Sequence, residues 1–262
     1  MIRVQSLSVD YRTNEGYVAA LKGLSLDIPK KEVTAIVGES GSGKSTLLYS
    51  VLRLLPPGTK VKGSIIAEAS DVLTMDYEKL NRFRWNRCAL ILQGAMSSFT
   101  PVLSIGSQIA ETIIHHRGLS SREAFLKTSE LLERVGLPAA FASRYPHELS
   151  GGQKQRAAIA MAISCDPDFL LADEPTTALD VITQAEITVL LAELVAEKGM
   201  GLCMVTHDLP LALSLCHNLA VMKEGEIVET GRPEMLLEKP RHPHTVELVE
   251  SIRKLEEGSI AK

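Results

Sequence analysis

Hydrophobic residues near the N-terminus alternate with polar ones in two short series: Ile2, Val4, Leu7 and Val9, then Leu24, Leu26 and Ile28. Successive side chains of a strand point to opposite faces, so this spacing predicts half-buried antiparallel strands. Residues 33–38 (VTAIVG) are instead continuously apolar and β-branched. Such a run predicts a strand that is buried on both faces. We expect the same of residues 169–173 (FLLAD) and 201–207 (GLCMVTH), and a short strand over 89–93 (ALILQ).

Helical spacing follows several of these strands. It covers residues 44–55 and residues 181–198, where Gly199 ends the pattern. Between residues 96 and 165 the helical period dominates, and one apolar stripe contains Leu126, Leu131, Leu132 and Val135. Alternating strands and helices predict a mostly parallel sheet flanked by helices.

The remaining segments have patterns typical of turns and of a C-terminal helix. Residues 56–63 (PPGTKVKG) predict a turn or loop. Residues 218–231 predict a hairpin around Glu224–Gly225. Residues 241–258 (RHPHTVELVESIRKLEEG) predict a short amphipathic helix with an apolar edge of Val246, Val249, Ile252 and Leu255.

The simplest organisation is one domain over residues 1–262. Residues 1–95 and 166–235 would form an α/β nucleotide-binding core with an antiparallel β subdomain. Residues 96–165 would form an inserted helical subdomain, and residues 236–262 a C-terminal helical tail.

Composition narrows the class of protein. The chain is 45% hydrophobic and carries a net charge of −4, so it lacks the basic character that nucleic-acid binding requires. Four scattered cysteines (Cys88, Cys165, Cys203 and Cys216) form no zinc pattern and indicate a reducing, cytosolic compartment. Without an apolar run of eighteen residues or a signal-peptide core near Met1, we expect a membrane association to go through a partner.

The clearest chemical motif is GESGSGKS, which follows the buried strand and opens a helix. It fits the phosphate-loop pattern, in which backbone N–H groups cradle phosphates at a helix N-terminus. Its residues are Gly38, Glu39, Ser40, Gly41, Ser42, Gly43, Lys44 and Ser45, followed by Thr46. We expect Lys44 to contact the β and γ phosphates, Ser45 to bind Mg²⁺ and Thr46 to contact the α phosphate.

Polar side chains end three other predicted strands. Asp173 ends FLLAD, where it would bind Mg²⁺ through water or through one of the ion's direct ligands, and Glu174 follows as a candidate general base. His207 ends GLCMVTH and Gln93 ends ALILQ, so they would reach the γ-phosphate, Mg²⁺ or the attacking water. Each residue has a plainer alternative, namely a solvated strand end or a structural histidine.

A second anion-binding pattern, LSGGQ (149–153), also opens a predicted helix. In order, GESGSGKS, ILQ, LSGGQ, FLLADEP, ALD and VTHD resemble the motifs of ATP-binding cassette (ABC) ATPases over essentially the whole chain. The stretches RYPHELSGGQKQRAAIAMAIS, DEPTTALDV and HPHT look like the ATPase subunits of oligopeptide, dipeptide and nickel importers.

The resemblance implies a cassette fold, ATP and Mg²⁺ as cofactors, and roles for individual residues. Tyr11 matches the aromatic residue that stacks on adenine, and Asp180 the aspartate of the D-loop. Gln93, Glu174 and His207 match the Q-loop glutamine, the catalytic glutamate and the switch histidine.

The resemblance also implies partners. Two ATPase subunits would meet head to tail, so that each ATP lies between one phosphate loop and the other subunit's signature residues: Ser150, Gly151, Gly152 and Gln153. Transmembrane permease subunits would dock on the helical subdomain, where residues 94–110 suit either a docking groove or a buried helix. An extracytoplasmic solute-binding protein would act indirectly, and the chain would lie at the cytoplasmic face of the membrane.

Some residues of this chain depart from the pattern of the importer ATPases. Leu92 and Gly94 differ from the residues common beside the Q-loop glutamine, and no cysteine-rich tail supports an iron–sulfur cluster.

A soluble cassette ATPase acting on DNA or ribosomes is the main alternative to an importer subunit. Peptide, nickel and oligosaccharide cargo are all compatible with the motifs. The pairs His115–His116 and His242/His244 predict solvated surface rather than a metal site.

Overall fold

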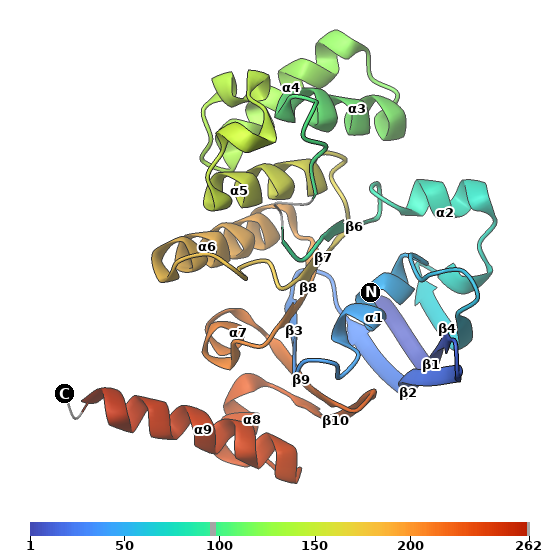
Figure 1. Ribbon diagram of the computed structural model, residues 1–262, viewed down its shortest axis with the longest axis vertical. Helices are drawn as coiled ribbons and strands as arrows, with labels where there is room; N and C mark the ends of the chain where they lie inside the picture. The colour runs from blue at the N-terminus through green and yellow to red at the C-terminus, as the bar shows by residue number, and fades with distance from the viewer. Residues whose placement is uncertain (95–97, 261–262) are drawn as a thin grey trace. The chain divides into compact units, whose positions relative to one another are not determined.

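The computed structural model describes residues 1–94 and 98–260, and side chains as far as Ser251. The chain forms two compact units, one of residues 1–75 with residues 203 onward and one of residues 76–202 (Figure 1). Strand β8 (Gly201–Thr206) carries the chain from the second unit into the first. The sequence predicted a different division, with boundaries at residues 96 and 166. That three-part organisation stays a prediction.

An antiparallel sheet opens the first unit, with strand order β2-β1-β4-β5. Its strands are β1 (Ile2–Thr13), β2 (Gly16–Ile28), β4 (Lys60–Ala67) and β5 (Ser70–Asp71). The predicted alternation is confirmed, and a bulge explains why it skips a residue between Val4 and Leu7. Ser6 adopts φ +45° there and donates its N–H to Ser25 Oγ at 2.9 Å. The bulge keeps Leu7 on the buried face.

Strand β4 corrects the loop predicted over residues 56–63, because the strand begins at Lys60. Gly63, which suggested a turn, lies opposite the bulge of β1. A Cβ added to Gly63 would lie 2.5 Å from the carbonyl oxygen of Ser6. The glycine therefore marks a close backbone approach inside a sheet rather than the end of a strand.

Parallel pairing forms the core of the first unit, in the order β10-β9-β3-β8. Strand β3 (Val33–Val37) is buried at every residue and runs parallel to β9 (Asn218–Lys223). Strand β10 (Glu226–Gly231) returns antiparallel to β9. The turn between them has positive φ at Glu224 and Gly225, which confirms the predicted hairpin.

The helices of the first unit are α1 (Lys44–Val51), α7 (Leu209–Leu215), α8 (Pro233–Glu238) and α9 (Pro243–Ile260), with a 3-10 turn over Val72–Thr74. Helix α1 ends before residue 55, the predicted limit. Arg53 adopts φ +50°, and the prolines that follow disfavour further helix. Helix α9 confirms the predicted tail helix, with Val249 buried on its inner face, while the side chains of Ile252 and Leu255 lie outside the described residues.

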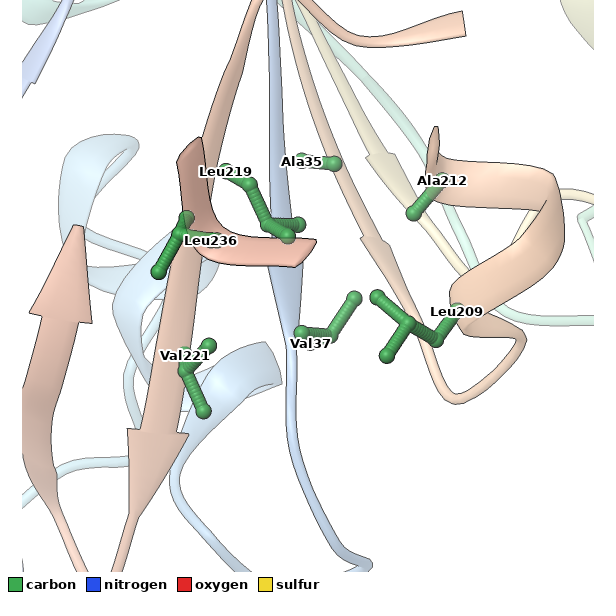
Figure 2. Packing of buried hydrophobic residues seen from close by; sticks show 7 residues of the cluster. All are labelled: Ala35, Val37, Leu209, Ala212, Leu219, Val221 and Leu236. Atoms are coloured by element: carbon green, nitrogen blue, oxygen red, sulfur yellow. The ribbon is translucent and has the colours of Figure 1, made fainter. Parts of the chain in front are cut away.

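An apolar cluster joins α7 and α8 to strands β3 and β9 (Figure 2). Its members are Ala35, Val37, Leu209, Ala212, Leu219, Val221 and Leu236. Leu248 of α9 packs against the same cluster, so the tail helix rests on the core that supports the strand leading to the phosphate loop.

The second unit contains β6 (Cys88–Ile91) parallel to β7 (Phe169–Asp173), as predicted. Its helices are α2 (Tyr77–Phe83), α3 (Ile105–Arg117), α4 (Ser121–Arg134), α5 (Gly151–Ala162) and α6 (Val181–Lys198), with 3-10 turns over Ala139–Ser143 and Pro146–Glu148. Helix α6 ends at Gly199 in a left-handed conformation, at the predicted position. Helices α3, α4 and α5 gather together in Figure 1.

Helix α4 corrects one predicted core residue. Its buried side chains are Ala124, Thr128, Leu131 and Leu132. Leu126 falls on another face of the helix and is 60% exposed, because it is five residues from Leu131 rather than three or four.

The four cysteines differ in their burial. Cys88, Cys165 and Cys203 are buried, whereas Cys216 is half-buried. Burial raises the pKa of the Cys203 thiol to about 12, so this thiol stays protonated and behaves as a small apolar side chain.

The apolar cluster gives a stability prediction. Leu236→Ala removes buried methyl groups and should lower the free energy of unfolding by about 2–5 kcal/mol in urea denaturation. Met235→Ala on the same helix is the control, because Met235 is 63% exposed and should change stability little. Equal losses from both variants would contradict the packing.

Candidate functional site

The phosphate loop joins β3 to α1 in the first unit, and its glycines allow two close approaches. A Cβ added to Gly38 would lie 2.1 Å from the carbonyl oxygen of Met222, and one added to Gly43 would lie 2.6 Å from that of Ala20. Gly43 also adopts φ +102°, which L side chains rarely adopt. Only glycine lets the loop pass this close to its neighbours.

Polar groups inside the loop fit a phosphate ligand. Lys44 Nζ donates to the carbonyl oxygens of Gly38 at 2.8 Å and Glu39 at 2.7 Å. The Ser42 hydroxyl is buried and has no hydrogen-bond partner among the described residues. A buried polar atom without a partner is costly, and a phosphate oxygen would satisfy it. The loop therefore has the donors that a nucleotide requires.

Tyr11 and Thr46, both predicted site residues, are in contact. The hydroxyl of Tyr11 in β1 donates to Thr46 Oγ1 in α1 at 3.1 Å. This hydrogen bond fixes an aromatic ring beside the helix that follows the phosphate loop.

A carboxylate pair ends strand β7 in the second unit. Asp173 is fully buried, and Glu174 follows with φ +46°. Such left-handed conformations are strained for a glutamate and tend to occur at active sites. Gln93 Nε2 donates to Glu174 Oε2 at 3.0 Å, and Thr177 Oγ1 donates to the same oxygen at 2.8 Å. The Glu174 carboxylate thus has a fixed orientation.

The LSGGQ segment opens α5, as predicted, through a capping box. Gln153 N donates to Ser150 Oγ at 3.3 Å, while Ser150 N donates to Gln153 Oε1 at 3.0 Å. A Cβ added to Gly152 would lie 2.7 Å from the methyl group of Thr183. The glycine therefore lets the signature helix approach α6.

Asp180 caps α6 at the same place. Its carboxylate accepts the Thr183 hydroxyl at 2.7 Å and the Thr183 N–H at 3.0 Å. These hydrogen bonds, chiefly the one from the hydroxyl, hold the pKa of Asp180 below its usual value. Asp180 is therefore charged at neutral pH and is fixed by the residue that touches Gly152.

The predicted residues fall into two sets. Tyr11, the phosphate loop and His207 belong to the first unit; His207 is exposed directly after β8. Gln93, Asp173, Glu174, Asp180 and LSGGQ belong to the second. The structure brings together Tyr11 with Thr46, and Gln93 with Glu174.

Sequence reasoning missed two residues. The hydroxyl of Thr177 binds Glu174, and the only sequence signal is a hydroxyl residue three positions after the carboxylate. His244 was expected on a solvated surface but is 2% exposed, because the first turn of α9 packs against other parts of the first unit, including Glu39. Among the described residues, no cluster of three or more His, Cys, Asp or Glu side chains could hold a metal ion.

A family model described as "ABC transporter" matches residues 21–177, more than half of the chain. The chain belongs to the ABC transporter family and is an ATPase of that family.

Relatives and solved structures agree with this assignment. The chain is 39% identical to the dipeptide transport ATP-binding protein of Lactococcus lactis, over 96% of this chain and 73% of the relative. It is 38% identical to the oligopeptide transport ATP-binding protein of Bacillus subtilis, over 98% and 73%. The dimeric ATP-binding cassette MJ0796, bound to ADP and phosphate, superposes with a TM-score of 0.79 at 31% identity, over 89% of this chain and 99% of that one.

These similarities confirm the predicted fold class, an ABC ATPase cassette with mixed α/β architecture. They also identify this chain as a nucleotide-binding protein. In the part of the chain that the structure describes, no helix is both long and apolar enough to cross a membrane.

The Glu174 contacts give a kinetic prediction. Thr177→Val removes one donor to the carboxylate and should lower kcat for ATP about tenfold, since a hydrogen bond to a charged group contributes about 1.5 kcal/mol. Nucleotide affinity should stay unchanged, because the contact lies at the carboxylate rather than at the phosphate loop. Thr177→Ser keeps the hydroxyl and is the matched control in a steady-state ATPase assay. A normal kcat for Thr177→Val would show that this hydrogen bond has no part in turnover.

Proposed function

We propose that this chain is the ATP-hydrolysing subunit of a membrane importer of oligopeptides or dipeptides. The catalytic part of this proposal rests on one observation. The carboxylate of Glu174, which follows the buried Asp173, is oriented by two hydrogen-bond donors. The cargo class is supported by similarity over nearly the whole chain to dipeptide and oligopeptide transport ATP-binding proteins.

The nucleotide would lie on the phosphate loop, with Tyr11 against adenine. Backbone N–H groups of residues 38–43 and the α1 N-terminus would hold the phosphates, and Lys44 would exchange its two carbonyl acceptors for phosphate oxygens. Thr46 would contact the α phosphate. Ser45, Asp173 and the carbonyl oxygen of the Gln93 amide offer the hard oxygen ligands that Mg²⁺ prefers.

Hydrolysis would use Glu174 as the general base. When bound, Mg²⁺ would neutralise charge that develops on the phosphate oxygens. The Glu174 carboxylate would accept a proton from the attacking water, while Gln93 and Thr177 hold its orientation. The exposed imidazole of His207 would donate a hydrogen bond to the γ-phosphate.

A second cassette subunit would complete each site. Ser150 and the N–H groups of Gly151 and Gly152 would add donors to a phosphate held by the partner's loop, with Gln153 closing the turn. A triphosphate would satisfy donors from both chains, whereas a diphosphate would not. ATP binding and hydrolysis would then drive closing and opening of the pair.

A permease would dock on the second unit at the cytoplasmic face of the membrane. Within the proposed docking segment 94–110, residues 95–97 lie outside the described residues. Val102 is 75% exposed and Leu103 43% exposed, whereas Ile105 and Ile109 are buried in α3. The exposed pair supports an apolar contact with a partner, and the buried pair supports the packed-helix alternative for the rest. Co-purification with a membrane subunit would separate an importer from a soluble cassette.

The role of Glu174 is tested by Glu174→Gln. This variant should bind ATP with unchanged affinity and lose turnover by about 10²–10⁴-fold, as expected when a general base is removed. Equilibrium binding of a fluorescent ATP analogue and single-turnover hydrolysis measure the two quantities separately. Hydrolysis at the wild-type rate would remove Glu174 from this role.

The role of the signature loop is tested by Ser150→Arg. A bulky cation here should prevent ATP-driven dimerisation but leave nucleotide binding by the single subunit intact. Sedimentation velocity with a non-hydrolysable ATP analogue reports the dimer. Ser143→Arg is a control in the same unit, since Ser143 is exposed and lies outside the motif. Unchanged dimerisation of Ser150→Arg would overturn the shared site.

A further inference from the structure

The buried imidazole of His244 is not used by the proposed hydrolysis. Its side chain is 2% exposed, and neither ring nitrogen has a hydrogen-bond partner among the described residues. Polar atoms in such surroundings ordinarily have a partner, so an unmatched pair of ring nitrogens requires an explanation.

Contacts on both sides fix the position of this ring. Before it, Glu229 of β10 accepts the N–H groups of Arg241 and His242, each at 3.0 Å. The N–H of His244 donates to Nδ1 of His242 at 3.2 Å. After it, Leu248 packs on the apolar cluster of the first unit. The first turn of α9 is therefore held firmly where the ring lies.

Two carboxylates approach the ring. Nδ1 of His244 lies 4.0 Å from Glu39 Oε1 and 3.8 Å from Glu247 Oε2. Glu247 belongs to the same helix, but Glu39 belongs to the phosphate loop, and its own carbonyl oxygen accepts Lys44 Nζ at 2.7 Å. The Glu39 side chain is 72% exposed, so it can move to shorten the contact.

We propose that His244 is a positioning residue for the phosphate loop, which it couples to the C-terminal helix through Glu39. Nδ1 is the ring nitrogen nearest both carboxylates, so an N–H at this atom links Glu39 of the loop to Glu247 of α9. The loop conformation that binds nucleotide and the docked position of α9 then stabilise each other.

Because of this coupling, nucleotide binding at the phosphate loop changes how firmly α9 is docked. If helix docking favours the nucleotide-binding loop, nucleotide must favour helix docking by the same factor. The inference rests on the proposed placement of nucleotide on the phosphate loop, and it adds a connection from that loop to a surface formed by α9.

The experiment measures hydrogen exchange of the α9 amides over residues 244–251 in the full chain, with and without a magnesium complex of a non-hydrolysable ATP analogue. In the wild type, nucleotide should slow this exchange about fivefold, a coupling at the low end of the usual range. In Glu39→Gln and in His244→Gln the slowing should disappear when each variant is measured at a concentration of analogue that saturates it. Glu39→Gln changes an exposed side chain, so it tests the contact without threatening the fold.

Affinities from a double-mutant cycle give the second readout. Glu39 also repels the triphosphate directly, so the coupling between the two substitutions, rather than either one alone, reports the contact. We expect a coupling of about fivefold in the Kd of the analogue. Glu250→Gln, on the exposed face of α9, is the control and should behave as the wild type.

Different results would overturn the coupling and the proposed nucleotide site. A purely structural role for His244 would change α9 exchange equally with and without nucleotide, and Glu39→Gln would have no effect; that result overturns the coupling. Additive affinities in the cycle would overturn it too. Failure of the wild type to bind the analogue, or equal binding by Lys44→Ala, would contradict the proposed nucleotide site instead.

Discussion

The close approach of the phosphate loop to two backbone carbonyls is the constraint on which the rest of the site depends. The oxygens of Ala20 and Met222 lie 2.6 and 2.1 Å from the positions that Cβ atoms on Gly43 and Gly38 would occupy. Ala20 belongs to the antiparallel sheet and Met222 to the parallel one, so the loop is clamped between both sheets of the first unit. This clamp places Lys44 at the start of α1 and keeps the Ser42 hydroxyl inside the loop. A loop with side chains at these positions could not keep this path.

The second unit uses hydrogen bonds rather than close packing to orient its charged groups. Glu174 is held through Gln93, which follows β6, and through Thr177 in the turn before α6. Asp180 is held by Thr183, whose methyl group touches Gly152 of the signature helix. The turn that ends at Asp180 and the LSGGQ segment are therefore packed against each other through Thr183 within one unit.

Local patterns predicted much of this structure because they depend on near neighbours. The continuous apolar runs became β3 and β7, and the GKS and SGGQ sequences opened helices as expected. The errors depend on contacts distant in sequence. Gly63 looked like a turn because nothing local shows the bulge of β1 against it. His244 looked like surface because its burial is made by segments remote in the sequence. The roles of Tyr11 and Asp180, and the cargo, came from resemblance and not from the pattern of residues.

We propose that each ATP site is shared between two cassettes, with the phosphate loop of one and the signature loop of the other. A direct test mixes two inactive chains, Lys44→Ala and Ser150→Arg, and measures the ATPase rate of the assembled pair. One site of the mixed pair would combine an intact phosphate loop with an intact signature loop, so we expect activity to return to a substantial fraction of the wild-type rate. No activity in the mixture, with a mixed pair demonstrably formed, would contradict a shared site.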